Sequence, residues 1–405
     1  MVRYLVRVQP GMIEQVQTEL RKLGVRPVSK VFDYVVVDVP PNMVPRIQAI
    51  PGVISVERER VYRISAVMPV ERKLQQFLKM LSNPLTAPMA FTWSAQVKEK
   101  ERWLLSESRK VVEADIAEQE GITGRGVKVA VLDTGWDRFS LQKVNIDYTS
   151  STIEGQPDVL DENGHGDWCI TCIGGKEFRT PWGVIKGVAP NAIIAAIKCL
   201  GYGLGSGSNS SVLRAMAEAV AWGADVISMS LGSDIAPEER HDPTTCPLCR
   251  IVSGLSDKAI FVIAAGNSGE GYASCPGIAP EAVTVAAINS GGGIANFVSR
   301  RHPQYLTLNK PTISAPGVNT LSSSCGFIDV MEYMDGVKLA AISGTSMATP
   351  HAAGVIALWI EYAMKNGVKL TTNDIFECIR QGRSWDPDYG YGVIKYTWIK
   401  DYLRR

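Results

Sequence analysis

The stretch Val127-Lys128-Val129-Ala130-Val131-Leu132-Asp133-Thr134-Gly135 decides the fold. It is a short apolar run that ends in an acidic residue and a turn glycine. Continuous apolar runs, rather than polar and apolar alternation, are typical of strands in a parallel sheet covered on both faces. We therefore predict a buried strand over 127–132, with Asp133 at the carboxyl end where open α/β sheets gather catalytic and ligand-binding groups.

The same pattern continues through residues 111–405, where apolar strands alternate with helical segments. This alternation predicts an α/β domain with a doubly wound, mostly parallel sheet. Further strands are expected at Ala192–Lys198, Val226–Ser230, Ala259–Ala264 and Ala282–Ala287, and helices near Cys169–Ile173, at Ser211–Trp222 and from the Ser346 region to about Met364.

Residues 1–65 form a separate unit by pattern. The order of expected elements is βαββαβ, which indicates a small α+β, ferredoxin-like domain. The strands are expected at Val2–Val8, Val25–Phe32, Tyr34–Val39 and Val53–Tyr62, and the helices at Met12–Leu23 and Val44–Ile50.

Residues 66–110 are interpreted as a helical connecting arm. Leu74, Phe77, Leu78 and Leu81 form an amphipathic stripe, which we expect to pack on the protein's own surface. Docking of a partner or of a membrane surface is the alternative for this stripe. A second, charge-rich helical stretch is expected from Gln96 to Glu113.

The composition limits the classes of function. The net charge of the 405 residues is +1, so no overall field favours nucleic acid or an anionic membrane. No apolar run approaches the roughly 18 residues that a transmembrane helix needs. Residues 1–8 alternate polar and apolar positions instead of forming a secretory signal, so the chain stays in the cytosol, is exported by another route, or has been trimmed of a leader.

The eight cysteines do not form a disulfide framework in a chain of this length. Cys246 and Cys249 form one CxxC pair, whereas a structural zinc site usually needs two such pairs or added histidines. With four histidines in the chain, we expect buried thiols or a local disulfide there and no metal, with zinc as the alternative. Cys169 and Cys172 are interpreted as core thiols.

Four residues at the ends of predicted elements carry reactive groups. Asp133 follows a strand, His165 lies between two glycines, Ser346 opens a long apolar helix, and Asn267 follows another strand. Taken singly, they have structural interpretations as a helix-capping Asp, a structural His, a capping Ser and a turn Asn.

Together these residues supply every part of an acyl-transfer site. His165 can accept the proton of Ser346, and Asp133 can hold the imidazole tautomer. Asn267 and the N–H of Ser346 can donate to an oxyanion. The chain order Asp133, His165, Ser346 is that of the subtilisin type of triad.

Three segments resemble the catalytic motifs of the subtilase family: Asp133-Thr134-Gly135, Gly164-His165-Gly166 and Gly344-Thr345-Ser346-Met347-Ala348-Thr349-Pro350-His351. The resemblance extends over roughly residues 111–397. It implies a serine endopeptidase that acts on protein or peptide substrates, with no cofactor needed for the chemistry. It also implies a cis peptide bond at Cys275–Pro276. The substrate-binding residues that it implies, between which an extended peptide would lie as an added strand, are Gly203, Leu204, Gly205, Ser230, Leu231, Gly232, Ala264, Ala265 and Gly266.

Residues 1–65 resemble the inhibitory propeptide of these proteases. The resemblance implies a zymogen that cleaves itself near Ser65 and Ala66, with a later cut within the arm as the alternative. A catalytically silent or permanently restrained subtilase fold, used for binding or assembly, is the competing function.

The chain departs from the family pattern in three places, one of which is the arm at residues 66–110, longer than the usual junction. Asp167-Trp168 replaces the usual Thr-His after Gly166, which we expect to affect the shape of the helix that follows His165. The loop Gly174–Ile185 lacks the usual calcium-binding pattern, so structural calcium is only an alternative, and Asp158 and Asp161 are expected to be solvated.

Overall fold

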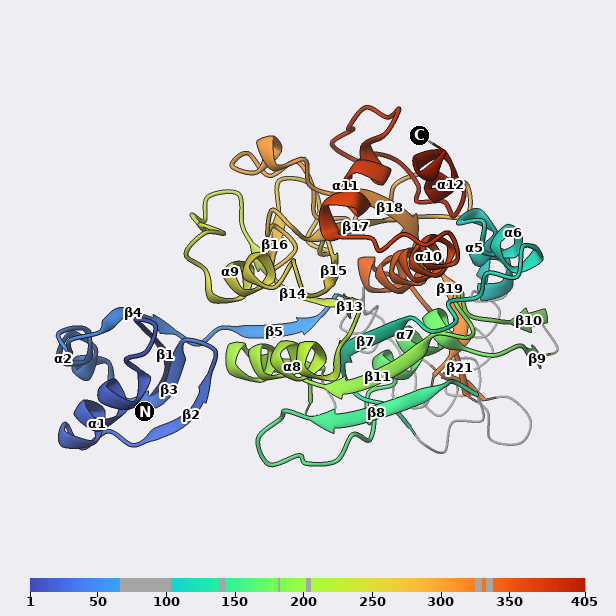
Figure 1. The fold of residues 1–405 in the computed structure, drawn as a ribbon. Helices are drawn as coiled ribbons and strands as arrows, with labels where there is room; N and C mark the ends of the chain where they lie inside the picture. Colours follow the sequence, from blue (N-terminus) through green and yellow to red (C-terminus); the bar gives the residue numbers. More distant parts are fainter. Residues whose placement is uncertain are drawn as a thin grey trace, which may run out of the picture.

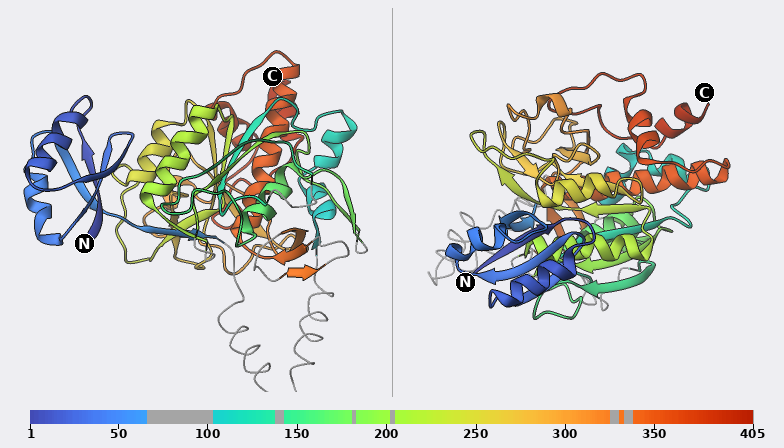
Figure 2. Two further views of the ribbon diagram at one scale, coloured as in Figure 1. Left: turned by 90° about the horizontal axis from the view of Figure 1, so that it is seen from below. Right: turned by 60° about the vertical axis from the view of Figure 1, so that its left-hand side comes forward.

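A computed structural model describes residues 1–65, 103–137, 143–180, 183–201, 205–324, 330–332 and 338–404. Within these residues a small N-terminal domain stands beside a larger α/β domain, and strand β5 (Val61–Ile64) runs from the first into the second (Figure 1). The left view of Figure 2 shows the small domain at one side of the larger one.

A seven-stranded sheet forms the centre of the larger domain, in the order β18-β17-β15-β13-β7-β11-β8. Every neighbouring pair in it is parallel. The expectation of a doubly wound parallel sheet is therefore confirmed. Its strands are β7 (Lys128–Asp133), β8 (Ile146–Ser151), β11 (Ile193–Lys198), β13 (Val226–Met229), β15 (Ile260–Ala264), β17 (Val283–Ile288) and β18 (Ile313–Pro316).

Alternate residues of the sheet pack into two apolar cores because successive side chains of a strand point to opposite faces. Val129 and Val131 of β7 face α7 (His165–Gly174) and α10 (Thr345–Lys365). Ala130 and Leu132 face the other core, which contains α8 (Asn209–Trp222) and α9 (Pro247–Gly254). The continuous apolar run of the sequence follows from this burial on both faces.

The other elements of the larger domain surround this sheet. Two shorter helices, α11 and α12, pack beside α10 in the first core. Their bounds, with those of the remaining elements, are β6 (Trp103–Leu104), α5 (Leu105–Val111), α6 (Ala114–Gln119), β9 (Phe178–Thr180), β10 (Gly183–Ile185), β12 (Ser206–Ser208), β14 (Leu231–Ile235), β16 (Ala273–Cys275), η2 (Leu306–Leu308), β19 (Thr320–Ser323), β20 (Val330–Glu332), β21 (Lys338–Ile342), α11 (Thr372–Arg380) and α12 (Trp398–Leu403).

The N-terminal domain has the predicted ferredoxin-like topology, with an antiparallel sheet in the order β2-β3-β1-β4. The single strand expected over Val53–Tyr62 is wrong, because the chain leaves this sheet after Arg58. Residues 61–64 form β5, whose backbone pairs with β12 and β14 of the larger domain instead. The elements are β1 (Val2–Val8), α1 (Ile13–Lys22), β2 (Pro27–Val31), β3 (Tyr34–Val39), η1 (Pro41–Met43), α2 (Val44–Gln48) and β4 (Val53–Arg58).

Polar contacts hold the small domain against α8 and α9. The carboxylate of Glu59 accepts hydrogen bonds from the N–H (3.1 Å) and the hydroxyl (2.6 Å) of Ser210 in the first turn of α8. A carboxylate is favourable there because the first N–H groups of a helix lack partners within the helix. Arg250 of α9 forms an ion pair with Asp33 at 2.5 Å.

Of the predicted arm, residues 66–102, including the apolar stripe, lie outside the described residues. Residues 103–110 pack on the larger domain: Trp103 and Leu104 pair with β19, and the buried Arg109 donates to the carbonyl of Gly187 at 3.1 Å. No helix among the described residues is long and apolar enough to cross a membrane.

Glu361 of α10 holds the chain that leads into β7. Its Oε2 accepts hydrogen bonds from the N–H groups of Thr123 (2.6 Å), Gly124 (2.6 Å) and Arg125 (3.0 Å). The residue is 2% exposed, so these donors have little access to water as a replacement partner.

We expect Glu361→Ala to lower the free energy of unfolding by about 2–4 kcal/mol, because it leaves buried N–H groups without an acceptor. Urea denaturation followed by tryptophan fluorescence measures the change, in a Ser346→Ala background that excludes self-digestion. Glu270→Ala is the control, since the Glu270 side chain is 60% exposed and its ion pair with Arg300 should contribute less than about 1 kcal/mol. Equal losses in the two variants would contradict this role of Glu361.

Candidate active site

Asp133 and His165 are joined by a hydrogen bond at the carboxyl end of the sheet. Asp133 ends β7, His165 begins α7, and Nδ1 of the imidazole lies 2.7 Å from Oδ1 of the carboxylate. Both side chains are buried. Because Asp133 holds Nδ1, the other ring nitrogen, Nε2, is left to exchange a proton, and it has no hydrogen-bond partner within the described part of the chain.

The glycines of the two motifs are required by close backbone contacts. A Cβ atom on Gly166 would lie 2.4 Å from the carbonyl oxygen of Gly135. Gly135 has a φ of +123°, and a Cβ there would lie 2.2 Å from the carbonyl oxygen of Val159. The start of α7 therefore packs directly on the turn after β7, which brings the imidazole to the carboxylate.

Asp161 fixes the start of α7 and is not solvated as expected. It is 3% exposed, and Oδ1 accepts from the N–H groups of Asn163 (3.1 Å) and Gly164 (2.8 Å). Oδ2 accepts from the N–H of Asp167 at 2.8 Å. Burial raises the pKa of the Asp161 carboxyl, while the hydrogen bonds from Gly164 and Asp167 oppose that shift. The sequence position in an acidic loop hid this helix-capping role, whereas Asp158 is exposed as expected.

The unusual pair after Gly166 is accommodated within a regular helix. The carboxylate of the buried Asp167 accepts from the hydroxyl of Ser323 at 3.4 Å. The indole N–H of Trp168 donates to the carbonyl of Ala340 at 3.1 Å. Both residues thus connect α7 to the β19–β21 sheet.

Ser346 lies in the first turn of α10, close to Asp133 and His165. The thiol of Cys169 lies 3.9 Å from Nδ1 of His165 and 3.7 Å from the carbonyl oxygen of Ser346. The Ser346 hydroxyl donates to the carbonyl of Ser230 at 2.9 Å rather than to His165. The structure therefore brings all three predicted triad residues together, with the serine hydroxyl turned toward Ser230.

The carbonyl oxygen of Ser65 occupies the space in front of Ser346. It accepts hydrogen bonds from the N–H of Ser346 at 3.0 Å and from the side-chain amide of Asn267. These are the two donors expected from the sequence to receive an oxyanion. The expected partner of Ser65 at the junction, Ala66, lies outside the described residues.

Thr345 orients the amide of Asn267, a role that sequence reasoning missed. Oδ1 of Asn267 accepts from both the N–H and the hydroxyl of Thr345, each at 3.0 Å. With its oxygen held in this way, the amide presents its NH₂ group to the carbonyl of Ser65. The Gly-Thr-Ser motif contained this signal, because Thr345 directly precedes the serine.

β5 lies as an added strand between β12 and β14, antiparallel to both. The N–H of Ile64 donates to the carbonyl of Gly205 (3.0 Å), and the N–H of Ser65 donates to that of Ser230 (3.1 Å). Leu231 and Gly232 pair with Ile64 and Arg63, as expected for strands that bind an extended peptide. Gly203 and Leu204 lie outside the described residues.

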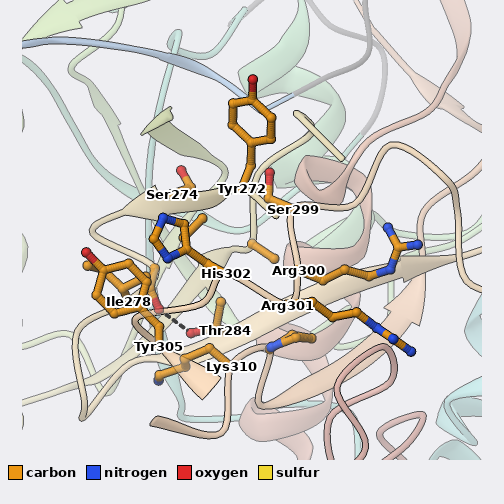
Figure 3. Close-up of a pocket in the computed structure, with 14 residues that line it drawn as sticks. Tyr272, Ser274, Ile278, Thr284, Ser299, Arg300, Arg301, His302, Tyr305 and Lys310 are labelled. Carbon is orange, nitrogen blue, oxygen red and sulfur yellow. Dashed lines mark hydrogen bonds between the residues drawn. The ribbon is translucent and has the colours of Figure 1, made fainter. Parts of the chain in front are cut away.

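In the remaining predicted segment, Ala264–Gly266, Ala264 ends β15 and Ala265 lines a small cavity (Figure 3). Ser274 lies on its wall, and a Cβ on Gly266 would lie 2.8 Å from the Cβ of Ser274. Figure 3 also shows the rings of His302 and Tyr305 against each other, with their centroids 4.6 Å apart. As expected, Cys275–Pro276 is a cis peptide.

Seven cysteines in the described part of the chain are free and buried. Cys169 and Cys172 are core thiols of α7, as expected. The thiol of Cys172 lies 3.3 Å from Nδ1 of His351, whose pKa is lowered to about 4 by burial.

A doubly wound parallel sheet that brings Asp133, His165 and Ser346 together in this order has the subtilisin-like architecture. The model of the subtilase family matches residues 124–392, and the chain belongs to this family. The predicted fold class and family are thus confirmed.

Similar proteins include an alkaline protease from Alkalihalobacillus alcalophilus, 35% identical over 272 residues. That alignment covers 65% of this chain and 63% of the alkaline protease, less than two thirds of its length. Subtilisin Savinase from Lederbergia lenta is also 35% identical, with 65% and 90% of the two chains covered. Serine protease AprX from Bacillus subtilis is 31% identical over 301 residues, with 67% and 66% covered.

Replacement of Asp161 by alanine is expected to lower the free energy of unfolding by about 2–4 kcal/mol, because three N–H groups at the start of α7 lose their acceptor. Asp158→Ala is a matched control: its exposed carboxylate accepts from the N–H of Leu160, and its loss should cost less than about 1 kcal/mol. Urea denaturation in the Ser346→Ala background gives both values. The two variants behaving alike would show that Asp161 does not support the His165 helix.

Proposed function

We propose that this protein is a serine endopeptidase in which Ser346 is the nucleophile and His165 the general base and acid. Asp133 orients the imidazole and balances its positive charge when it is protonated. The observation that carries the proposal is the position of the Ser65 carbonyl, which accepts from both Asn267 and the N–H of Ser346. A peptide carbonyl held by these two donors is in the position of a substrate carbonyl about to be attacked.

The chemistry follows from the groups in place. When the Ser346 hydroxyl turns from Ser230 to Nε2 of His165, the imidazole can take its proton as the oxygen attacks the carbonyl carbon. The negative charge that develops on the carbonyl oxygen is stabilised by Asn267 and by the N–H groups at the start of α10. His165 then gives the proton to the leaving amine, and water hydrolyses the acyl-enzyme by the reverse sequence.

The first substrate in this proposal is the chain itself, at the bond between Ser65 and Ala66. Residues 1–65 act as an internal inhibitor, because β5 fills the strand position that a peptide substrate needs. Glu59 and Asp33 add contacts from the small domain to α8 and α9, so the domain is expected to stay bound after cleavage.

The surroundings of Ser65 favour a small side chain before the scissile bond. Ser65 is 8% exposed and therefore enclosed. A Cβ on Gly232, which pairs with β5, would lie 2.0 Å from Oγ of Ser274. A Cβ on Gly266, the residue before Asn267, would lie 2.8 Å from the Cβ of Ser274. Ser274 thus leaves little room between Gly232 of β14 and Gly266 of the loop after β15. We infer a preference for residues the size of serine or alanine.

A permanently restrained or silent subtilase is the second candidate. One observation favours it: the Ser346 hydroxyl donates to Ser230, so the hydrogen bond to His165 is not formed in this conformation. Labelling by a serine-directed phosphonate, after the processed chain has been freed of residues 1–65, separates the two. Labelling at Ser346 supports the peptidase, and a processed chain that resists labelling supports the restrained protein.

The Ser346→Ala chain is expected to remain intact, whereas the unmodified chain is cut after Ser65 and both pieces copurify. Intact-mass measurement of the purified proteins detects the cut to the residue. Ser343→Ala is the matched control, because its hydroxyl contacts Asn319 instead of the substrate carbonyl. A Ser346→Ala chain cut at the same position would show that another protease makes the cut.

Asn267→Ala should lower kcat by about 10²–10³-fold, a magnitude that comes from the same kind of substitution in a subtilisin, a member of this family. Thr345→Val should lower kcat by about tenfold with little change in KM, since it removes one hydrogen bond that orients Asn267. Thr349→Val is the control: its hydroxyl bonds to the carbonyl of Thr345 within the helix and does not contact Asn267. Hydrolysis of a peptide ester by the processed enzyme, freed of residues 1–65, gives these constants. Equal effects of the two threonine variants would remove the orienting role of Thr345.

A further inference from the structure

Four side chains with metal-binding atoms meet in a buried cluster separate from the active site. They are His241, Cys246, Cys249 and Cys275, and their ligand atoms all lie within 4.8 Å of one another. Cys246 and Cys249 lie at the start of α9, and Cys275 ends β16. All four residues are buried.

The spacing of these atoms fits a tetrahedral metal site. The sulfur of Cys275 lies 3.3 Å from that of Cys246 and 3.5 Å from that of Cys249. Nε2 of His241 lies 3.9 Å from the sulfur of Cys249. Ligands about 2.3 Å from a central zinc ion lie about 3.7 Å apart at tetrahedral angles, close to these separations. A disulfide needs sulfur atoms about 2.05 Å apart, so the cysteines are not paired with each other.

We propose that His241, Cys246, Cys249 and Cys275 bind one structural Zn²⁺ ion. Three thiolates and one imidazole form a closed donor set that suits zinc, and a closed set leaves no open position for catalysis. This differs from the sequence expectation of thiols or a disulfide without metal. The fold supplies the donors that the CxxC pair lacks: His241 from the preceding loop and Cys275 from a distant strand.

Neighbouring hydroxyl groups support the cluster from outside. The hydroxyl of Tyr305 donates to the carbonyl of His241 and so fixes the loop that carries the imidazole. The hydroxyl of Tyr62 lies 3.4 Å from the sulfur of Cys275 and is placed to donate to a thiolate there. Donors of this kind orient the ligands of a metal and tune their charge.

Tyr62 connects the zinc site to the peptide-binding groove. It belongs to β5, is completely buried, and lies three residues before Ser65. β16, which carries Cys275, pairs with β14, and β14 pairs with β5. The ion therefore fastens α9, the His241 loop and β16 into the wall of the pocket that receives Tyr62. The metal site is independent of the proposed peptidase activity, whereas this pocket role rests on it.

The first test is the zinc content of the full chain, in the Ser346→Ala background and purified without chelators. We expect about one Zn²⁺ per chain by inductively coupled plasma mass spectrometry. Cys249→Ser and Cys275→Ser should lose it, and Cys378→Ser, which replaces a buried cysteine outside the cluster, should keep it. A zinc content that is unchanged in the cluster variants would overturn the proposal.

The second test uses the unmodified cluster, so that misfolding of a variant cannot decide the result. Zinc is removed with a chelator under reducing conditions and Co²⁺ is added. Intense visible absorption of tetrahedral cobalt with thiolate ligands is expected, and its loss on adding Zn²⁺ supports the site. A full chain that takes up neither ion, or whose denatured mass shows two cluster cysteines oxidised to a disulfide, contradicts it.

The pocket role has its own readout in the processed enzyme once residues 1–65 have been removed. Zinc removal should lower kcat/KM at least about tenfold more for a peptide with tyrosine at the position of Tyr62 than for the same peptide with alanine there. Equal losses for the two peptides would reject the pocket role and leave the metal site standing. A lack of hydrolysis of either peptide by the zinc-loaded enzyme would instead count against the proposed function.

Discussion

The two hydrogen bonds accepted by the carbonyl of Ser65 are the constraint on which much of the structure depends. Their donors come from separate elements: the N–H of Ser346 from the start of α10, and the amide of Asn267 from the loop after β15. Both elements belong to the sheet domain, while the acceptor belongs to the chain that leaves the small domain. The three can meet only if β5 enters the groove in register with β12 and β14.

That register is held from both ends of β5. At its start, the carboxylate of Glu59 binds the first turn of α8, and the backbone of Arg60 pairs with Asn209. At its end, the N–H of Ser65 bonds to Ser230. A shift by one residue would turn Tyr62 out of its buried pocket and bring another carbonyl to the two donors, since side chains along a strand alternate in direction. The same contacts that hold the Ser65 carbonyl against the two donors also keep β5 in the groove between β12 and β14.

The sequence predicted those parts of the fold that depend on local pattern. The apolar run before Asp133 predicted a central parallel strand because strands covered on both faces exclude polar residues. The Gly-His-Gly segment identified His165 as a candidate base, and the close contact of Gly166 with Gly135 explains the glycine that follows it. Ser346 and Asn267 were identified because the other motifs occur with them in the same chain. Taken alone, a serine at a helix start is usually a cap and an asparagine beside glycine is usually a turn residue.

What the sequence did not predict depends on contacts between distant segments. Asp161 and Asp158 are alike in sequence, and only the packing of the α7 start decides that one is a buried cap. Residues 53–62 have one strand pattern, yet the edges of β12 and β14 take its last part into another sheet. The cluster around Cys275 is the extreme case, since its four donors come from a loop, a helix start and a strand end. The proposed ion at that cluster would give the groove a rigid wall where β5 inserts the large side chain of Tyr62. The buried hydroxyl of Tyr62 then has a charged sulfur to bond to, which offsets the cost of removing it from water.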